Sequence, residues 1–168
     1  MSFEYGDGSN FTTYLGWILP WDKKLTLVGA REDVENAIRD LSRIGIDSPD
    51  TAIGTDPASL APMAGVTSYP RVDWQGMLAG RPEEETILDV RRTDEYDAAH
   101  IPGAVNIPLH ELLARIGEVP AGRLWVHCGS GYRAGIAASL LQRGGKDPVH
   151  IDALFADAAS AGVALIKG

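Results

Sequence analysis

The sequence predicts an α/β fold in which a parallel sheet is covered by helices on both faces. From about Arg71 onward, short apolar segments alternate with segments of helical periodicity, and strands separated by helices form parallel sheets. The most regular helical segment, RAGIAASLLQRGG, stops at a Gly-Gly pair, which is a typical helix end. The 168 residues suffice for one large domain or for one and a half small ones.

The segment after Arg71 contains the elements of one domain in order. TILDV (Thr86–Val90) predicts a buried strand because it is short and apolar. Thr93 is the expected cap of a helix over TDEYDAA, whose first turn is acidic. The remaining segments are the extended IPGAVNIP, the amphipathic helix LHELLARIG ending at Gly117, the strand RLWVHC, the helix ending at the Gly-Gly pair, the strand PVHID and a last helix over ALFADAASAG.

The first third of the chain predicts a partial α/β repeat. KLTLVGAREDVENAIRDLSRIGID has the same strand, turn and helix order as RLWVHCGSGYRAGIAASLLQRGGKD. Leu25 aligns with Leu124 and Leu41 with Leu141, so the second copy has one extra loop residue, and AGV at Ala64 matches AGV at Ala161. The alternative is two unrelated strand–turn–helix units. The segment DSPDTAIGTDPASLAPMAGVTSYP is expected to be largely loop or linker, so we expect domains at 1–65 and 66–168.

Composition narrows the partners and the compartment. The net charge of −8 argues against nucleic acid, because phosphate binding needs a basic face. No apolar run is long enough to span a bilayer, and the N-terminus MSFEYGDGSN lacks the pattern of a secretory signal. A single cysteine forms no internal disulfide, which fits a reducing compartment. We therefore expect a cytoplasmic protein with no membrane partner, in which any anion site supplies its own positive potential.

The segment VHCGSGYRAG contains that only cysteine, Cys128, between a predicted strand and a predicted helix. Backbone N–H groups of a glycine-rich turn form an anion-binding nest, and the helix N-terminus adds the positive end of its dipole. A sulfur among such donors is stabilised as a thiolate, and Arg133 offers a charge to an incoming oxyanion. The alternative is a buried structural cysteine, which would need neither the glycines nor the arginine.

Two motifs resemble the rhodanese family of sulfurtransferases. LDVRRTDEYDAAHIPGAVNIP resembles the family's D-V-R segment followed by its G-H-I-P-G-A-x-N-x-P segment, and CGSGYRA resembles its C-x-S-G-x-R-S active loop. Together they place the resemblance on residues 66–168, nearly a whole domain. The resemblance implies a rhodanese-like three-layer fold, with a central parallel sheet flanked by helices.

The same resemblance implies a chemistry. Cys128 would take a sulfane sulfur from a donor such as thiosulfate or a low-molecular-weight persulfide, carry it as a persulfide and pass it to a thiol or to cyanide. Cys128 and Arg133 are the expected catalytic residues. The residues expected to bind substrate are Gly129, Ser130, Gly131, Tyr132, Asp89 and Arg91. Small sulfur-containing anions and thiols are the expected partners.

The sequence departs from the family pattern at several positions. Ala134 replaces the serine after the loop arginine, and Ala99 replaces the glycine before His100. The family's late G-G and tryptophan appear as Ala153-Leu154 and Ala158. The first two departures bear on substrate preference and the last on packing near the loop, whereas the nucleophile and the arginine are retained.

Loop length separates two related chemistries. Tyrosine phosphatases, and the cell-cycle phosphatases that share the rhodanese fold, use H-C-x5-R, whereas Arg133 follows Cys128 by five positions. The shorter loop favours a sulfur atom on the cysteine over a tetrahedral phosphate beside it. A phosphatase or arsenate reductase is the alternative enzyme, and a sulfur-relay or interaction module without turnover is the non-catalytic alternative.

The remaining polar residues have two interpretations each. Asp89 either frames the active site or is a helix-capping or surface carboxylate, and Arg91 either adds positive potential or is solvated. His100 is expected to bond the backbone, and His127 to point away from the nucleophile because side chains alternate along a strand. Tyr132 either touches substrate or covers the pocket. The four histidines show no metal-ligand spacing, so we expect no metal and no cofactor.

The N-terminal segment carries a second, shorter resemblance. GWILPWDK and LSRIGID resemble the degenerate rhodanese-like unit of proteins that join a metallo-β-lactamase-fold domain to two rhodanese-like units. This implies a fragment or a shortened protein, with a metallo-β-lactamase-fold domain as a partner. Trp17, Ile18, Leu19 and Trp21 need to be buried, so we expect this half-unit to pack on the active domain or on a second copy in a homodimer.

Overall fold

The fold is seen in a computed structural model, which describes residues 3–6, 10–20, 23–56 and 67–168. The chain divides into a unit over Tyr69–Gly168 and a unit over Glu4–Ser68. None of the helices within the described residues is both long and apolar enough to cross a membrane. Trp21 and the AGV at Ala64 lie outside the described residues.

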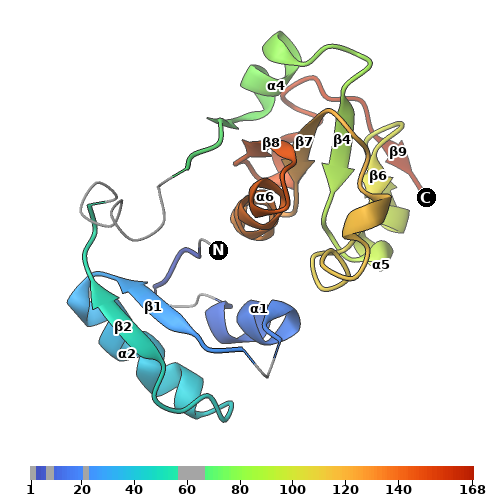
Figure 1. Cartoon of the computed structure of the whole chain (residues 1–168). Helices are drawn as coiled ribbons and strands as arrows, with labels where there is room; N and C mark the ends of the chain where they lie inside the picture. Colours follow the sequence, from blue (N-terminus) through green and yellow to red (C-terminus); the bar gives the residue numbers. More distant parts are fainter. Residues whose placement is uncertain (1–2, 7–9, 21–22, 57–66) are drawn as a thin grey trace. The chain divides into compact units, whose positions relative to one another are not determined.

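The unit Tyr69–Gly168 is built on a five-stranded sheet with the order β3-β8-β7-β4-β6 (Figure 1). All four strand pairs are parallel. The strands are β3 (Arg71–Val72), β4 (Thr86–Asp89), β6 (Val105–Asn106), β7 (Arg123–His127) and β8 (Asp147–Ile151). The three long strands have buried side chains on both faces, as a sheet covered on both sides requires.

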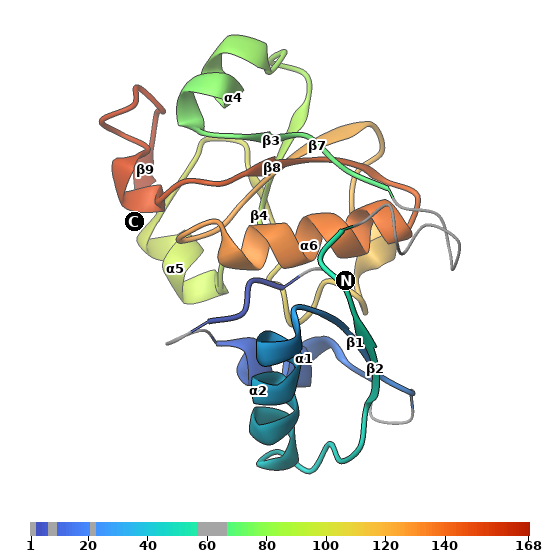
Figure 2. The same cartoon turned by 90° about the vertical axis from the view of Figure 1, so that its left-hand side faces the viewer.

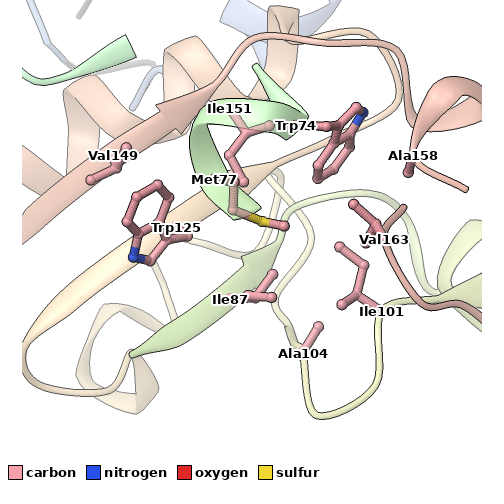
Figure 3. Packing of buried hydrophobic residues seen from close by; sticks show 10 residues of the cluster. All are labelled: Trp74, Met77, Ile87, Ile101, Ala104, Trp125, Val149, Ile151, Ala158 and Val163. Carbon is pink, nitrogen blue, oxygen red and sulfur yellow. The ribbon is translucent and has the colours of Figure 1, made fainter. Parts of the chain in front are cut away.

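Helices cover the two faces of this sheet. Helix α4 (Trp74–Gly80) lies on one face and α6 (Tyr132–Arg143) on the other (Figure 2). The α4 face is filled by ten buried side chains from α4, the strands, the β5–β6 connection and the C-terminal segment, namely Trp74, Met77, Ile87, Ile101, Ala104, Trp125, Val149, Ile151, Ala158 and Val163 (Figure 3). The architecture confirms the predicted α/β fold with a central parallel sheet flanked by helices.

Strand register brings three chain segments to one edge of the sheet. Asp89 pairs with His127, and Val126 pairs with His150. The segments that follow these carboxyl ends are therefore neighbours, and they contain Cys128 and Asp152. In parallel α/β sheets this edge is where ligands bind.

Two predicted helices are mostly turns. LHELLARIG forms turns and a short 3-10 helix, η1 (Ile116–Glu118). Its buried residues Leu109 and Leu112 are three positions apart, and a single turn is enough to bring both to the core. The last segment contains only η2 (Phe155–Asp157) followed by turns. There Ser160 Oγ donates to Asp157 O at 2.8 Å, a local bond that competes with a regular helix.

Helix α5 (Thr93–Ala98) begins one residue away from the predicted cap. Its N-cap is Arg92, and Thr93 is the first helical residue. The Glu95 carboxylate accepts a hydrogen bond from the Arg92 backbone N–H at 3.2 Å, as in a capping box. The helix leads into a short antiparallel pair of β5 (Ala99–His100) with β9 (Ile166–Lys167).

The unit Glu4–Ser68 contains α1 (Phe11–Ile18), β1 (Thr26–Gly29), α2 (Arg31–Ser42) and β2 (Asp50–Ile53), with β1 and β2 parallel. Strand β2 lies in the segment that was expected to be linker. Its side chains are mostly exposed, so the sequence there lacks the apolar run that predicts a buried strand. Ile18 is buried as expected, whereas Trp17 is 42% exposed. Ala30 alone connects β1 to α2, and residues 128–131 connect β7 to α6. The two connections therefore differ by more than the one residue predicted.

Candidate active site

Cys128 is the first residue after β7, and the loop of residues 128–131 ends where α6 begins at Tyr132. The cysteine is free and fully buried, at 0% exposure. Ser130 is exposed at the tip of the loop, while Gly129 and Tyr132 are half-buried. The structure therefore places the predicted catalytic cysteine and three of the predicted substrate-binding residues in one short loop, and a fourth, Tyr132, at the start of α6.

Two carbonyl groups of the loop are bound by groups outside it. Gly129 O accepts a hydrogen bond from the Phe155 backbone N–H at 2.9 Å. Gly131 O accepts one from His150 Nε2, also at 2.9 Å. In a trans peptide the following N–H points opposite to the carbonyl, so the N–H groups of Ser130 and Tyr132 point away from these partners. Both N–H groups lie at or just before the start of α6, where the positive end of the helix dipole favours negative charge.

Gly131 is the one loop position whose backbone demands glycine. Its φ is +88°, in the region that L-residues with a Cβ disfavour. A Cβ added there would overlap Asp152 Oδ1 and lie 3.2 Å from Asp152 Cα. The glycine thus allows the segment after β8 to pack directly against the loop.

Arg133 is held by Glu95. Arg133 Nη1 donates to Glu95 Oε2 at 2.6 Å and Nη2 donates to Oε1 at 2.8 Å. The hydrogen bonds and the positive charge of Arg133 lower the pKa of Glu95, against the opposing effect of burial. The sequence predicted Arg133 as a clamp for an incoming anion, and the structure shows it already engaged by a carboxylate.

A second ion pair lies beside the loop. Arg71 donates from Nε to Asp152 Oδ2 at 2.8 Å, with a further contact from Nη2. Asp152 is the residue that packs against Gly131. Both arginines beside the loop are therefore paired with acids, so the local charge is balanced rather than strongly positive.

Asp89 and Arg91 are partners in a buried ion pair, not open groups. Their side chains are 0% and 5% exposed, and Arg91 donates to both carboxylate oxygens, at 3.0 Å from Nε to each and 2.6 Å from Nη2 to Oδ2. The Arg91 guanidinium also lies 3.7 Å from the centroid of the Phe155 ring. The surface-carboxylate and solvated-arginine interpretations are wrong. The pair was predicted among the substrate-binding residues, but its burial gives it a framing position beneath Phe155.

The two histidines that the sequence singled out are not placed for acid–base work. His100 Nδ1 donates to Tyr96 O at 3.0 Å, which confirms the predicted backbone bond. His127 is fully buried and faces Trp74 and Phe155. Burial lowers the pKa of His127 to about 4, although the Asp89 charge opposes the shift. The imidazole is therefore neutral at physiological pH.

Sequence reasoning missed three residues at the site: Glu95, His150 and Asp152. Glu95 was interpreted only as an acid in the first turn of a helix, and its pairing with Arg133 spans 38 positions. His150 and Asp152 stand at the end of the predicted strand PVHID. The rule that ligands bind at the carboxyl ends of parallel strands was the available signal for these two. Ala134, which replaces the family serine, is fully buried in the first turn of α6.

Comparison with known proteins identifies the domain. The family model described as Rhodanese-like domain matches residues 75–153. The chain is 42% identical over 64 residues to the putative sulfur carrier protein YrkF of Bacillus subtilis, covering 38% of this chain and 35% of that protein. It is 34% identical over 61 residues to the thiosulfate sulfurtransferase PspE of Escherichia coli, covering 34% of this chain and 59% of PspE. The chain thus spans about a third to three fifths of these relatives.

A solved structure supports the same fold. The rhodanese-related protein from Thermoplasma volcanium matches with a TM-score of 0.54 and 22% identity, over 58% of this chain and 98% of that chain. Residues 75–153 thus form a rhodanese-like domain with sulfurtransferase and sulfur-carrier relatives. The matches do not extend the assignment to a degenerate N-terminal unit or to a metallo-β-lactamase-fold fusion.

Proposed function

We propose that this protein is a sulfurtransferase that moves sulfane sulfur through a persulfide on Cys128. In the first step the Cys128 thiolate attacks the outer sulfur of a donor such as R–S–SH or thiosulfate. A bond forms between Cys128 Sγ and that sulfur, the donor's S–S or S–S(O₃) bond breaks, and the electron pair leaves with the thiolate or sulfite. In the second step a thiol or cyanide attacks the outer sulfur and Cys128 leaves as the thiolate. No external oxidant or reductant is needed.

The observation that carries this proposal is the outward binding of the loop carbonyls. Phe155 N–H and His150 Nε2 bind Gly129 O and Gly131 O, so the Ser130 N–H points to the opposite side of its peptide from Phe155, where it would stabilise negative charge beside Cys128. A persulfide carries its negative charge on the outer sulfur, so such a cradle stabilises both the thiolate and the persulfide. The relationship to a protein named a thiosulfate sulfurtransferase is consistent with this chemistry.

A relay role is the second candidate, because a matching relative is named a putative sulfur carrier. In that case Cys128 accepts sulfur and passes it only to a bound partner. A reducing cytoplasm would keep Cys128 available for either role. The phosphatase and arsenate-reductase alternatives are disfavoured by the spacing of Arg133 five positions after Cys128.

The test is intact mass spectrometry after incubation with thiosulfate or glutathione persulfide. We expect a mass increase of one sulfur atom, and since Cys128 is the only cysteine in the chain, Cys128→Ser abolishes it. Loss of the added sulfur to a small thiol or cyanide, with turnover, identifies an enzyme, whereas a stable adduct identifies a relay. Absence of an adduct with every donor would overturn the proposal. Ser130→Ala, which leaves the thiol in place, tests whether the loop hydroxyl contacts the donor.

The unit Glu4–Ser68 is proposed to be a degenerate rhodanese-like unit that associates with a second copy or with a metallo-β-lactamase-fold domain. Its parallel β1-α2-β2 order is that of β7-α6-β8, and Trp17 is exposed. Light scattering after size exclusion tests the homodimer, and a monomer at high protein concentration would exclude it.

A further inference from the structure

The Arg133–Glu95 ion pair lies directly over the cysteine loop. A Cβ at Gly129 would lie 3.0 Å from Arg133 Nη2 and 3.8 Å from Glu95 Oε1. Gly129 is the residue next to Cys128, whose side chain is fully buried. The arginine that would neutralise a bound anion is therefore already paired with a carboxylate beside Gly129.

Glu95 is fixed in this position from its own side. Its Oε2 accepts from the Arg92 backbone N–H at 3.2 Å as well as from Arg133. The carboxylate is thus anchored at the start of α5, and its side chain is only 30% exposed, against 13% for Arg133. Partly buried charges are costly to leave without a partner. A ligand that takes Arg133 away leaves the Glu95 carboxylate to the weaker ion pair with exposed Arg92, whose Nε lies 3.7 Å from Glu95 Oε2.

The neighbouring ion pair does not relieve this competition. Arg71, the other arginine beside the loop, is engaged by Asp152, which packs against Gly131. An entering oxyanion therefore meets two carboxylates whose charges are already matched by the two arginines. To bind either arginine, the oxyanion has to displace a carboxylate, and the displaced carboxylate then repels the oxyanion.

We propose that Glu95 is a specificity-determining residue that disfavours sulfur donors whose leaving group is an oxyanion and favours persulfides of small thiols. The inference rests on the sulfurtransferase function proposed above. Thiosulfate brings a sulfonate group with the sulfur that Cys128 attacks, and this group competes with Glu95 for Arg133. A persulfide R–S–SH brings its outer sulfur without an oxyanion. The loop N–H groups are then sufficient to bind that sulfur, and the Arg133–Glu95 ion pair stays intact beside the R–S group.

The transfer itself is the same for both donors. Cys128 Sγ bonds to the outer sulfur, and the leaving group is RS⁻ from the persulfide or sulfite from thiosulfate. Because the bond changes are alike, Glu95 is expected to act on donor binding and not on the sulfur-transfer step. The effect should therefore appear in KM for thiosulfate and leave kcat nearly unchanged.

The test is the pair of variants Glu95→Gln and Asp94→Asn in the full chain. Glutamine keeps an oxygen that accepts from the Arg92 N–H but removes the charge that holds Arg133. Asp94 lies one position away, is exposed and pairs with Arg92. Asp94→Asn therefore changes the net charge equally, and it leaves beside Glu95 both Arg133 and Arg92, whose Nε lies 3.7 Å from Glu95 Oε2. We expect Glu95→Gln to lower KM for thiosulfate about tenfold and to change kcat/KM for glutathione persulfide by less than about threefold. Asp94→Asn should change neither by more than about twofold.

Three results would overturn the inference: equal effects of Glu95→Gln on the two donors, an equal effect of Asp94→Asn on thiosulfate, or no change. These results leave the proposed function intact, because persulfide formation on Cys128 in the unaltered protein is measured separately by mass. Circular dichroism verifies that Glu95→Gln is folded. If it is not, Glu95→Asp keeps the cap and the charge but shortens the reach to Arg133, and it must shift the donor ratio in the same direction by a smaller factor.

Discussion

Replacing Gly131 by alanine tests whether the conformation of the loop of residues 128–131 depends on its close packing against Asp152. Two costs arise at this position. The first is the positive φ of +88°, which costs an L-residue with a Cβ about 1–2 kcal/mol. The second is the overlap of the new Cβ with Asp152, whose Cα would lie 3.2 Å away. Backbone cannot move aside as a flexible side chain can, so about 1–3 kcal/mol is added.

Gly122→Ala separates the two costs. Gly122 has a φ of +90°, and no described atom lies within 4 Å of the position of its Cβ. It therefore carries the backbone cost alone. We expect a loss of about 1–2 kcal/mol for Gly122→Ala and of about 3 kcal/mol for Gly131→Ala.

The assay is hydrogen exchange of the β7 and β8 amides, which reports the opening of the unit Tyr69–Gly168 without contributions from Glu4–Ser68. The same samples are tested for persulfide formation. We expect Gly131→Ala to lose the sulfur adduct under conditions where β7 and β8 remain protected, because the loop must move to accept the Cβ. Equal losses of stability in the two variants would refute the packing argument.

Three further predictions concern the surroundings of the loop. Asp89→Asn leaves Arg91 buried without its carboxylate and should lower the free energy of unfolding by about 3 kcal/mol in denaturant titrations. The pKa of His127 is about 4 in the folded protein, against 6.5 for an unperturbed histidine, so the unfolded state binds the proton first as the pH falls. The contribution of neutral His127 to the free energy of unfolding is then fully present above pH 6.5 and is lost as the pH falls toward 4, by about 3 kcal/mol in total. Denaturant unfolding curves at several pH values measure this loss, and His127→Phe should not show it. Ser130→Ala removes an exposed hydroxyl and should change stability by less than about 0.5 kcal/mol, so any change in persulfide formation by mass spectrometry reports a contact with the donor.

The parts of the site that the sequence predicted are those encoded locally. The apolar strand before Cys128, the glycines after it and the helix from Tyr132 all lie within about twenty positions. The strand β2 was missed because its side chains are mostly exposed and polar residues interrupt it, in a segment rich in proline, serine and aspartate. A strand at the edge of a small sheet buries little, so periodicity carries no signal there.

The charge state of the site could not be predicted in the same way. Arg133 and Glu95 are 38 positions apart, and nothing in either segment shows that the first turn of α5 lies beside the loop. Asp89 and Arg91 were singled out from the sequence, but two charged residues at the end of a strand can either be exposed to solvent or form a buried ion pair. The buried solution depends on Phe155, which lies more than sixty positions further on and stacks on the guanidinium. Sequence patterns thus locate the nucleophile, whereas its electrostatic surroundings come from tertiary contacts.

The connection between β1 and α2 shows what the loop adds to a common framework. Both β1-α2-β2 and β7-α6-β8 join two parallel strands through a helix, and this arrangement needs only the apolar faces of its elements. A nest needs several successive N–H groups, which residues 128–131 supply and Ala30 alone does not. The first turn of α2 instead contains Glu32 and Asp33, which interact favourably with the helix dipole and would repel an anion. The chemistry proposed for Cys128 therefore depends on the length of the connection between β7 and α6. The strand–helix–strand fold on either side of that connection forms with a short connection as well as with a long one.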